Sequence, residues 1–189
     1  MRVIAGEKGG RRLLAPPGRA TRPTSDRVRE AAFSMLESQG AVAGAYIWDL
    51  FAGSGALGIE ALSRGAAHAT FVDQARPSVS ATRANLEKLG YGTDRARVVC
   101  ADVLKWVYGL EGVLPGPGEA AGVGLVLADP PYAWQGWDAL LSALAPKAPV
   151  VMAETSEALE LPPGWHVLKS KRYGGTLITL ACLRDRGEA

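Results

Sequence analysis

Four consecutive residues combine an acid, two prolines and an aromatic ring, namely Asp129, Pro130, Pro131 and Tyr132. They follow an apolar run that predicts a buried strand, and ligands of open α/β folds bind at the carboxyl ends of strands. The prolines fix two φ angles and remove two N–H donors, so the local backbone offers carbonyl acceptors in a rigid geometry. The Asp129 carboxylate and the Pro130 carbonyl can each accept one N–H of an aromatic amine, while Tyr132 stacks on its ring.

This arrangement predicts a site that holds the exocyclic amino group of a nucleobase while a methyl group is transferred to it. The methyl carbon of a sulfonium is already electrophilic, so positioning of the amine does most of the work. The same acceptors stabilise the positive charge that builds on nitrogen. The base must leave any stack to enter such a pocket. Whether Asp129 also takes the departing proton is open.

A glycine-rich turn at 53–58, of the pattern GxGxxG, follows the first predicted strand and opens a helix. Glycines there allow the backbone to approach a ligand closely. Asp73 lies twenty residues after Gly53, at the end of the second predicted strand, where a carboxylate can accept both ribose hydroxyls of a nucleoside. The turn and the acid fit a dinucleotide-binding domain as well as a methyltransferase.

Two further carboxylates favour S-adenosylmethionine. Asp49, inside the first strand, could reach the methionine ammonium or order water beside it, whereas a pyrophosphate gains nothing from an anion there. Asp102, at the end of the third strand, can accept from the adenine amino group, and it can equally cap the helix that follows. The predicted cofactor-binding residues in this region are Asp49, Phe51, Ala52, Gly53, Ser54, Gly55, Gly58, Asp73, Asp102 and Asp129.

The elements that must position these residues alternate between strand and helix. Apolar runs predict strands at 46–51, 68–72, 97–100, 123–128 and 149–153, and a closing hairpin at 166–171 and 176–183. Helices are expected from residue 25 to about 39, from the glycine turn to about 64, and at 77–89, 103–110 and 137–144. This alternation implies an α/β fold whose mostly parallel, seven-stranded sheet is covered on both faces. The antiparallel hairpin makes the sheet mixed at one edge.

The first thirty residues form a basic arm. They hold eight basic and three acidic residues, a charge of +5, so the rest of the chain carries −3 of the net +2. Short strands and turns are expected over 1–23, with a strand at 2–4. A basic segment on a slightly acidic body suggests a polyanionic partner, although a solvated tail is the alternative. The predicted RNA-binding residues are Arg2, Lys8, Arg11, Arg12, Arg19 and Arg22.

The length and composition narrow the class of protein further. A chain of 189 residues suits one domain with a small appendage. No apolar run approaches the roughly 20 residues that span a bilayer, and no signal peptide is recognisable, so a cytoplasmic protein is expected. Cys100 and Cys182 have no metal-binding spacing and are expected to be buried, while His68 and His166 have no neighbouring ligands. Neither a metal site nor nucleophilic catalysis is predicted.

Along nearly its full length the sequence resembles the RsmD-type 16S rRNA guanine-N2 methyltransferases of bacteria. The matching segments are RVIAG at 2–6, GRRL at 10–13, RPTSDRVRE at 22–30, DLFAGSGALGIEALSRG at 49–65, and DPPY at 129–132. The segment 22–30 is the most specific to the family, because the other motifs recur in many amino methyltransferases.

The resemblance implies a Rossmann-like class I methyltransferase domain at 24–189 and a β-hairpin extension at 1–23. It implies methylation of N2 of one guanine, conventionally numbered 966, in the small ribosomal subunit or its assembly intermediate. It also implies that the segment 22–27 packs over the cofactor pocket, which adds Thr24 and Arg27 to the cofactor-binding residues. A monomer is expected. The loop at 114–122 is longer and richer in Gly and Pro than the family suggests.

Other functions remain compatible with the motifs themselves. The DPPY tetrapeptide serves adenine N6 or cytosine N4 as well as guanine N2, so only the resemblance selects guanine. A nicotinamide-dependent oxidoreductase and a nucleic-acid-binding module with a vestigial cofactor site are the alternatives from other classes.

Overall fold

The computed structural model describes residues 1–16, 26–110, 123–145, 147–148 and 150–183. Seven strands form one sheet in the order β3-β2-β1-β4-β5-β7-β6. The strands are β1 (Tyr46–Leu50), β2 (His68–Asp73), β3 (Ala96–Cys100), β4 (Leu125–Ala128), β5 (Val150–Thr155), β6 (Trp165–Tyr173) and β7 (Thr176–Leu183). The first five pair in parallel, and β7 is antiparallel to both β5 and β6. The sheet has the expected topology. Strands joined through a helix pair in parallel, and strands joined by a tight turn pair antiparallel.

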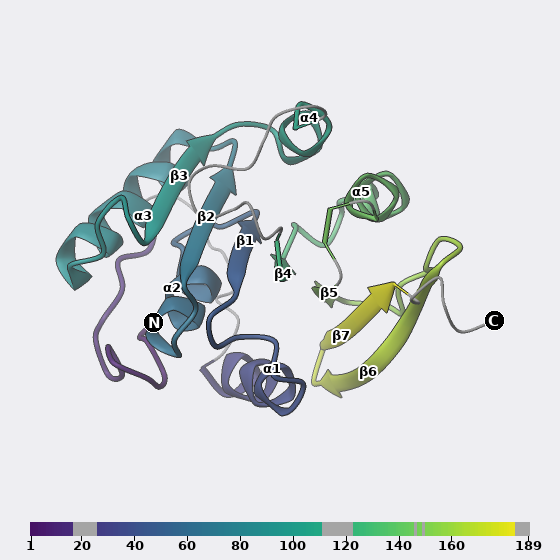
Figure 1. Cartoon of the computed structure of the whole chain (residues 1–189), viewed down its shortest axis with the longest axis horizontal. Helices are drawn as coiled ribbons and strands as arrows, with labels where there is room; N and C mark the ends of the chain where they lie inside the picture. Colours follow the sequence, from purple (N-terminus) through teal and green to yellow (C-terminus); the bar gives the residue numbers. More distant parts are fainter. Residues whose placement is uncertain (17–25, 111–122, 146, 149, 184–189) are drawn as a thin grey trace.

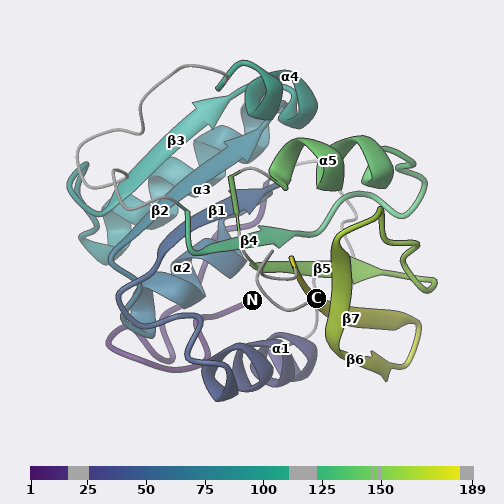
Figure 2. The same cartoon turned by 45° about the vertical axis from the view of Figure 1, so that its right-hand side comes forward.

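Five helices cover the two faces of the sheet, as Figures 1 and 2 show. The helices α1 (Asp26–Ser38), α2 (Ala56–Ser63) and α3 (Arg76–Leu89) lie on one face, and α4 (Val103–Tyr108) and α5 (Trp137–Leu144) lie on the other. Strands between two helical layers are buried on both sides, which is why β1, β2 and β4 read as nearly continuous apolar runs.

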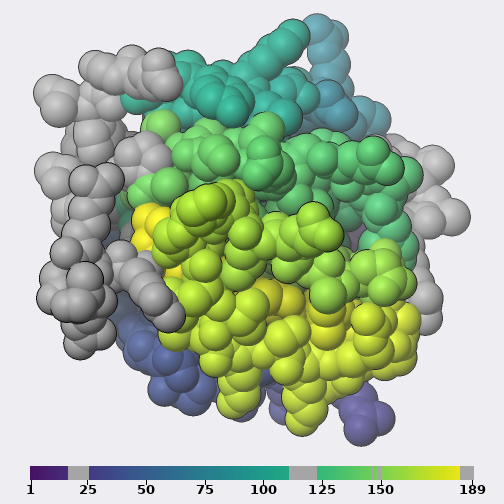
Figure 3. Space-filling model, turned by 90° about the vertical axis from the view of Figure 1, so that its right-hand side faces the viewer, coloured from purple at the N-terminus to yellow at the C-terminus, as the bar shows by residue number. Residues whose placement is uncertain are grey.

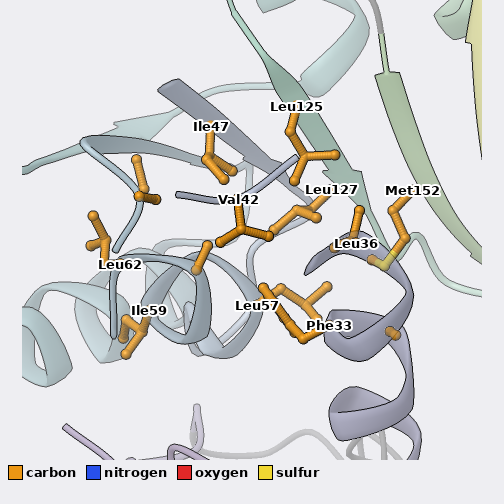
Figure 4. Close-up of a cluster of buried hydrophobic side chains, with 14 of the residues drawn as sticks. Phe33, Leu36, Val42, Ile47, Leu57, Ile59, Leu62, Leu125, Leu127 and Met152 are labelled. Carbon is orange, nitrogen blue, oxygen red and sulfur yellow. The ribbon is translucent and has the colours of Figure 1, made fainter. Parts of the chain in front are cut away.

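The larger core fills the space between the sheet and α1 and α2. In Figure 4, Phe33 and Leu36 of α1 point toward Leu57 of α2 and Leu127 of β4. A second core, which includes Val126 and Leu141, lies between the sheet and α4 and α5. Burial of one such side chain stabilises the fold by about 1.5–3 kcal/mol. Together the two cores fix the strand ends, and therefore the site residues that follow them.

The β6–β7 hairpin closes one edge of the sheet and occupies the lower half of the face in Figure 3, in yellow-green and yellow. Most of β6 is exposed on both sides, and it carries Lys169, Lys171 and Arg172. Charged side chains on an edge strand discourage pairing with another chain.

The described part of the basic arm, residues 1–16, folds back on itself and docks on α2 and α3. Its only ladder contact is one antiparallel bridge between Arg2 and Arg12, so the strand expected at 2–4 is not a regular strand. The reason is that its backbone N–H groups turn toward the helices: those of Ile4 and Ala5 donate to the Glu60 carboxylate at 2.7 and 3.0 Å. The arm is thus a capped hairpin held by side chains of the domain.

Glu60 is the centre of this docking and is fully buried. Besides the two N–H groups, it accepts a hydrogen bond from Arg64 at 2.7 Å and lies 3.8 Å from Arg29. Burial lowers the pKa of Arg29, and the charges of Glu60 and Asp26 oppose that shift. For Arg64 burial acts in the same direction, but its hydrogen bonds to Glu60 and Glu37 outweigh it and raise the pKa. Both arginines therefore stay charged, and the carboxylate is paired on every side.

Most predicted element boundaries agree with the structure to within two residues. Two expectations about the side chains are wrong. Cys100 is exposed, because it ends β3 at the open edge of the sheet, and Cys182 is half-buried. His166 does have a neighbouring sulfur, because its Nε2 lies 3.1 Å from the Cys182 Sγ where β6 pairs with β7. The predicted site residues Arg19, Arg22 and Thr24, and the loop at 114–122, lie outside the described residues. No described helix is long and apolar enough to cross a membrane.

Candidate methyl-transfer site

The glycine turn joins β1 to α2 and is held from beneath by Asp49. The Asp49 carboxylate, only 1% exposed, accepts the Gly58 N–H at 2.8 Å. Burial raises the pKa of Asp49 well above its usual value, the Gly58 hydrogen bond opposes this, and the charges of Asp129 and Asp73 add to it. The structure therefore places this carboxyl behind the turn, so that it orients the first turn of α2. Contact of Asp49 with a cofactor stays a prediction.

Two positions in the turn show why the chain uses glycine there. Gly55 has φ +79°, and a Cβ at Gly58 would lie 2.4 Å from the Phe71 ring. Above Gly53, by contrast, a Cβ would meet nothing nearer than the Phe51 carbonyl at 3.9 Å. The turn is therefore packed tightly on the protein side and open on the outer side, as a cradle for a ligand requires.

Asp73 ends β2 beside this cradle. One of its carboxylate oxygens accepts the Gly53 N–H at 2.9 Å, and the other accepts the Ala75 N–H at 2.8 Å. Thr82 of α3 fixes the same turn by donating to the Gly53 carbonyl at 3.1 Å. A carboxylate has about four acceptor positions, so two remain for the hydroxyls of a ribose. The predicted role of Asp73 fits this geometry.

Asp102 performs the structural role that the sequence left open. Its carboxylate accepts the Lys105 N–H at 3.0 Å and caps α4. The side chain is half-exposed at the carboxyl end of β3, and the cap uses one of its two oxygens, so the adenine contact stays a prediction.

The tetrapeptide begins directly after β4, in the middle of the sheet. Asp129 is half-buried and interacts electrostatically with Asp49. Tyr132 is 51% exposed, and its hydroxyl lies 3.2 Å from the Thr176 hydroxyl, which anchors the far end of the ring on β7. An exposed aromatic face held at its tip is suited to stacking on a base.

Aromatic rings connect the tetrapeptide to the glycine turn. Phe51, the residue after β1, has φ +63°, a conformation that side chains with a Cβ rarely adopt. Its ring packs edge-on against the Trp134 ring, with 4.8 Å between the ring centroids, and the Trp134 ring packs against the Trp137 ring with 5.5 Å between the centroids. Strained residues of this kind concentrate where a ligand is bound, so Phe51 links the two halves of the site.

The predicted RNA-binding residues differ in their surroundings. Arg11 and Arg12 are exposed, whereas Arg2 pairs with Asp26 at 3.2 Å and the Lys8 ammonium lies 5.5 Å from the centroid of the Tyr91 ring. The arm is coupled to the site through Asn85 of α3.

Asn85 is a fully buried link that the sequence did not reveal. It bonds both backbone groups of Leu14, at 2.7 and 3.0 Å, and also donates to the Ser54 carbonyl of the glycine turn at 2.9 Å. An asparagine within a helix gives no signal in a single sequence, because it reads as an ordinary polar position. It makes the arm and the cofactor turn one structural unit.

A seven-stranded sheet in the order β3-β2-β1-β4-β5-β7-β6 with β7 antiparallel, together with the glycine cradle, defines a class I S-adenosylmethionine-dependent methyltransferase. The solved structure of the Escherichia coli protein yhhF shares this fold at TM-score 0.80 and 30% identity, over 98% of this chain and 99% of that one. The solved complex of SMU.776 with SAH is alike in fold at TM-score 0.65 and 15% identity, over 84% of this chain and 49% of that one. The open outer side of Gly53 and the remaining acceptor positions of Asp73 fit S-adenosylmethionine as the cofactor.

The chain belongs to the family described as Conserved hypothetical protein 95, whose pattern matches residues 1–182. YlbH of Bacillus subtilis is 37% identical over 194 residues, 99% of this chain and all of that protein. A Haemophilus influenzae protein named ribosomal RNA small subunit methyltransferase D is 32% identical over 181 residues, 92% of this chain and 89% of that protein. The resemblance to the RsmD-type family is confirmed.

Proposed function

We propose that the protein transfers a methyl group from S-adenosylmethionine to the N2 amine of one guanine, of the 966 type, in bacterial 16S rRNA. The observation that supports the proposal is that Asp129 lies near Asp49 of the glycine cradle and continues into Pro130 and Tyr132, because two acceptors and an aromatic ring then follow directly from the predicted cofactor site. The ribosomal substrate is supported by the names of relatives that align over most of the chain.

In the proposed reaction the cofactor supplies an electrophilic methyl carbon on a sulfonium. The Asp129 carboxylate and the Pro130 carbonyl each accept one N–H of the guanine amine, which aims its nitrogen at the methyl carbon. As the N–C bond forms, the C–S bond breaks and its electron pair stays on sulfur. One proton then leaves the nitrogen, either to the Asp129 carboxylate or to a water molecule. The two acceptors stabilise the positive charge until that proton leaves.

The exposed Arg11 and Arg12 would bring the phosphate backbone to the site, with Arg19 and Arg22 continuing the arm. Phosphate contacts of this kind position an RNA without reading its sequence. The arm at 1–23 would serve as an RNA-binding appendage of a monomeric catalytic domain at 24–189. The protein would act in the cytoplasm on the small subunit or its assembly intermediate.

The test compares Asp129→Ala and Asp129→Asn with the wild type in methyl transfer to small subunits that lack the modification. Removal of one charge-stabilising group typically costs about 10²–10³ in rate, so the Ala variant should lose that much while S-adenosylhomocysteine binding is kept. The Asn variant retains an acceptor oxygen and should keep turnover within about tenfold if positioning dominates.

Asp138→Ala is the matched control, because Asp138 is an exposed carboxylate in the first turn of α5 and should leave the rate unchanged. Methylation by Asp129→Ala at the wild-type rate would refute the mechanism. Adenine N6 and cytosine N4 are the competing products, and mass spectrometry of the methylated nucleoside separates them. Thermal stabilisation by NADH but not by S-adenosylhomocysteine would instead indicate an oxidoreductase.

A further inference from the structure

A small pocket of about 200 Å³ adjoins the tetrapeptide and is distinct from the cofactor cradle. Pro130, Pro131 and Tyr132 form one wall, Trp134 and Trp137 another, and the segment 154–159 the third. Ligand pockets for drug-sized molecules span roughly 300–1,000 Å³, so this space suits a single flat base. Three aromatic rings around it are what a stacked nucleobase requires.

Glu154 is the buried carboxylate of this pocket, whereas Glu157, which also lines it, is exposed. Glu154 is the penultimate residue of β5, lines the pocket and is only 4% exposed. Ala153 pairs with Ala128 in the parallel register, so Glu154 and Asp129 are the next residues on two neighbouring strands. Neighbouring strands lie about 4.8 Å apart. A carboxylate acceptor therefore stands one strand away from the group that is proposed to hold the reacting amine.

The wall that carries Glu154 is fixed by its own contacts. Arg172 of β6 donates to the Ser156 carbonyl at 2.8 Å, and the Thr155 hydroxyl donates to the Glu157 carbonyl at 2.7 Å. A group that discriminates between ligands must be held rigidly, because a mobile acceptor adapts to either one. The segment 154–157 meets this requirement.

The three candidate bases differ at the ring position next to their exocyclic amine. Guanine has a hydrogen there, the N1–H donor. Adenine has an unprotonated N1 and cytosine an unprotonated N3, and both are acceptors. A carboxylate beside the amine therefore gains a charge-assisted hydrogen bond with guanine. With adenine or cytosine two acceptors would face each other, and neither could donate a hydrogen bond to the other.

We propose that Glu154 accepts the N1–H of the target guanine and thereby selects guanine over adenine and cytosine. This inference rests on the proposed function, because it presumes that the amine held by Asp129 is N2 of a guanine. The DPPY tetrapeptide does not distinguish the three bases, so in this proposal Glu154 of β5 determines which base is methylated. Sites built to hydrogen-bond a substrate group reject analogues that lack it by large factors.

The test uses 2-aminopurine, which keeps the amine at position 2 and lacks the N1–H. Small subunits are reconstituted with rRNA carrying either guanine or 2-aminopurine at the methylated position, once mass spectrometry has located it. Single-turnover methyl transfer is measured for the wild type and for Glu154→Gln. The matched control is Glu160→Gln, an exposed carboxylate further along the same segment. S-adenosylhomocysteine binding and thermal unfolding confirm that the variants are folded.

The wild type should prefer guanine strongly. Glu154→Gln should lose about 10- to 100-fold on guanine, the size of a charge-assisted hydrogen bond, and should methylate 2-aminopurine at least as fast as the wild type, because an amide can donate to its N1. Glu160→Gln should behave as the wild type.

Two results would overturn the role of Glu154 while the proposed function stands: an equal loss on both substrates, which indicates a structural role, or no loss on guanine. A wild-type product that is N6-methyladenosine or N4-methylcytidine, or no methylated guanine at all, would overturn both.

Discussion

Replacement of Glu60 by Gln should detach the basic arm from the domain. The fully buried carboxylate holds the N–H groups of Ile4 and Ala5 and compensates the charges of Arg29 and Arg64. A glutamine keeps the shape but has one acceptor oxygen and an NH2 group that faces other donors. Loss of one partner of a buried pair costs about 3–5 kcal/mol.

That cost is a large share of the 5–15 kcal/mol by which domains are usually stable. With a urea m-value of about 2 kcal/mol/M, the midpoint of unfolding should fall by about 1.5–2.5 M. The control is Glu37→Gln, which removes the other partner of Arg64, a carboxylate that is 48% exposed. An exposed pair contributes at most about 1 kcal/mol, so its midpoint should fall by about 0.5 M or less.

Limited trypsin digestion of the same variants, followed at Arg11 and Arg12, should show faster cleavage in Glu60→Gln only. A midpoint shift in Glu60→Gln no larger than that in Glu37→Gln would contradict this, and would mean that the Asn85 and Ser63 contacts are enough to hold the arm.

Three further outcomes follow from the site. Gly58→Ala places a Cβ 2.4 Å from the Phe71 ring, and overpacking of about 1–3 kcal/mol should lower the Tm by about 3–10 °C; an unchanged Tm in calorimetry would contradict the packing. Asp49→Asn should stabilise the protein at pH 7–8. Burial raises the pKa of Asp49 in the folded protein. The contribution of Asp49 to stability is therefore complete when the pH lies below its pKa in the unfolded chain, about 3.9, and is lost as the pH rises through its pKa in the folded protein. The Tm difference should therefore shrink toward pH 4, and a difference that grows on acidification would be evidence against it. Arg11→Glu with Arg12→Glu should weaken RNA binding and reduce the slope of log K against log salt by about 1.5–2; an unchanged slope would exclude both arginines from the interface.

The elements of the catalytic domain were predictable because their signals are local. The helix α3 ends where Gly90, with φ +75°, supplies the left-handed residue that such ends favour. Both strands of the final hairpin were predicted around Gly174-Gly175, although β6 extends two residues further at its carboxyl end. The fold and the identity of the candidate site residues follow from patterns of this kind.

What the sequence did not reveal depends on contacts between distant residues. Glu60 read as an ordinary helix residue, yet it organises the arm fifty-five residues away. Asp49 was predicted to contact a cofactor, and the structure adds a role that the sequence did not show, because its carboxyl accepts the Gly58 N–H and holds the glycine turn. Glu154 gave no motif, because only the register of β5 against β4 brings it beside Asp129. Strand register and contacts between distant residues cannot be read from a single sequence, so the roles of Glu60, Asp49 and Glu154 became visible only in the structure.

The most direct test of guanine-N2 methylation is nucleoside mass spectrometry of small-subunit rRNA from a strain that lacks the protein. One N2-methylguanosine should disappear, return with the wild-type gene, and not return with the Asp129→Ala variant. An unchanged content of N2-methylguanosine, or the loss of N6-methyladenosine or N4-methylcytidine in its place, would contradict it.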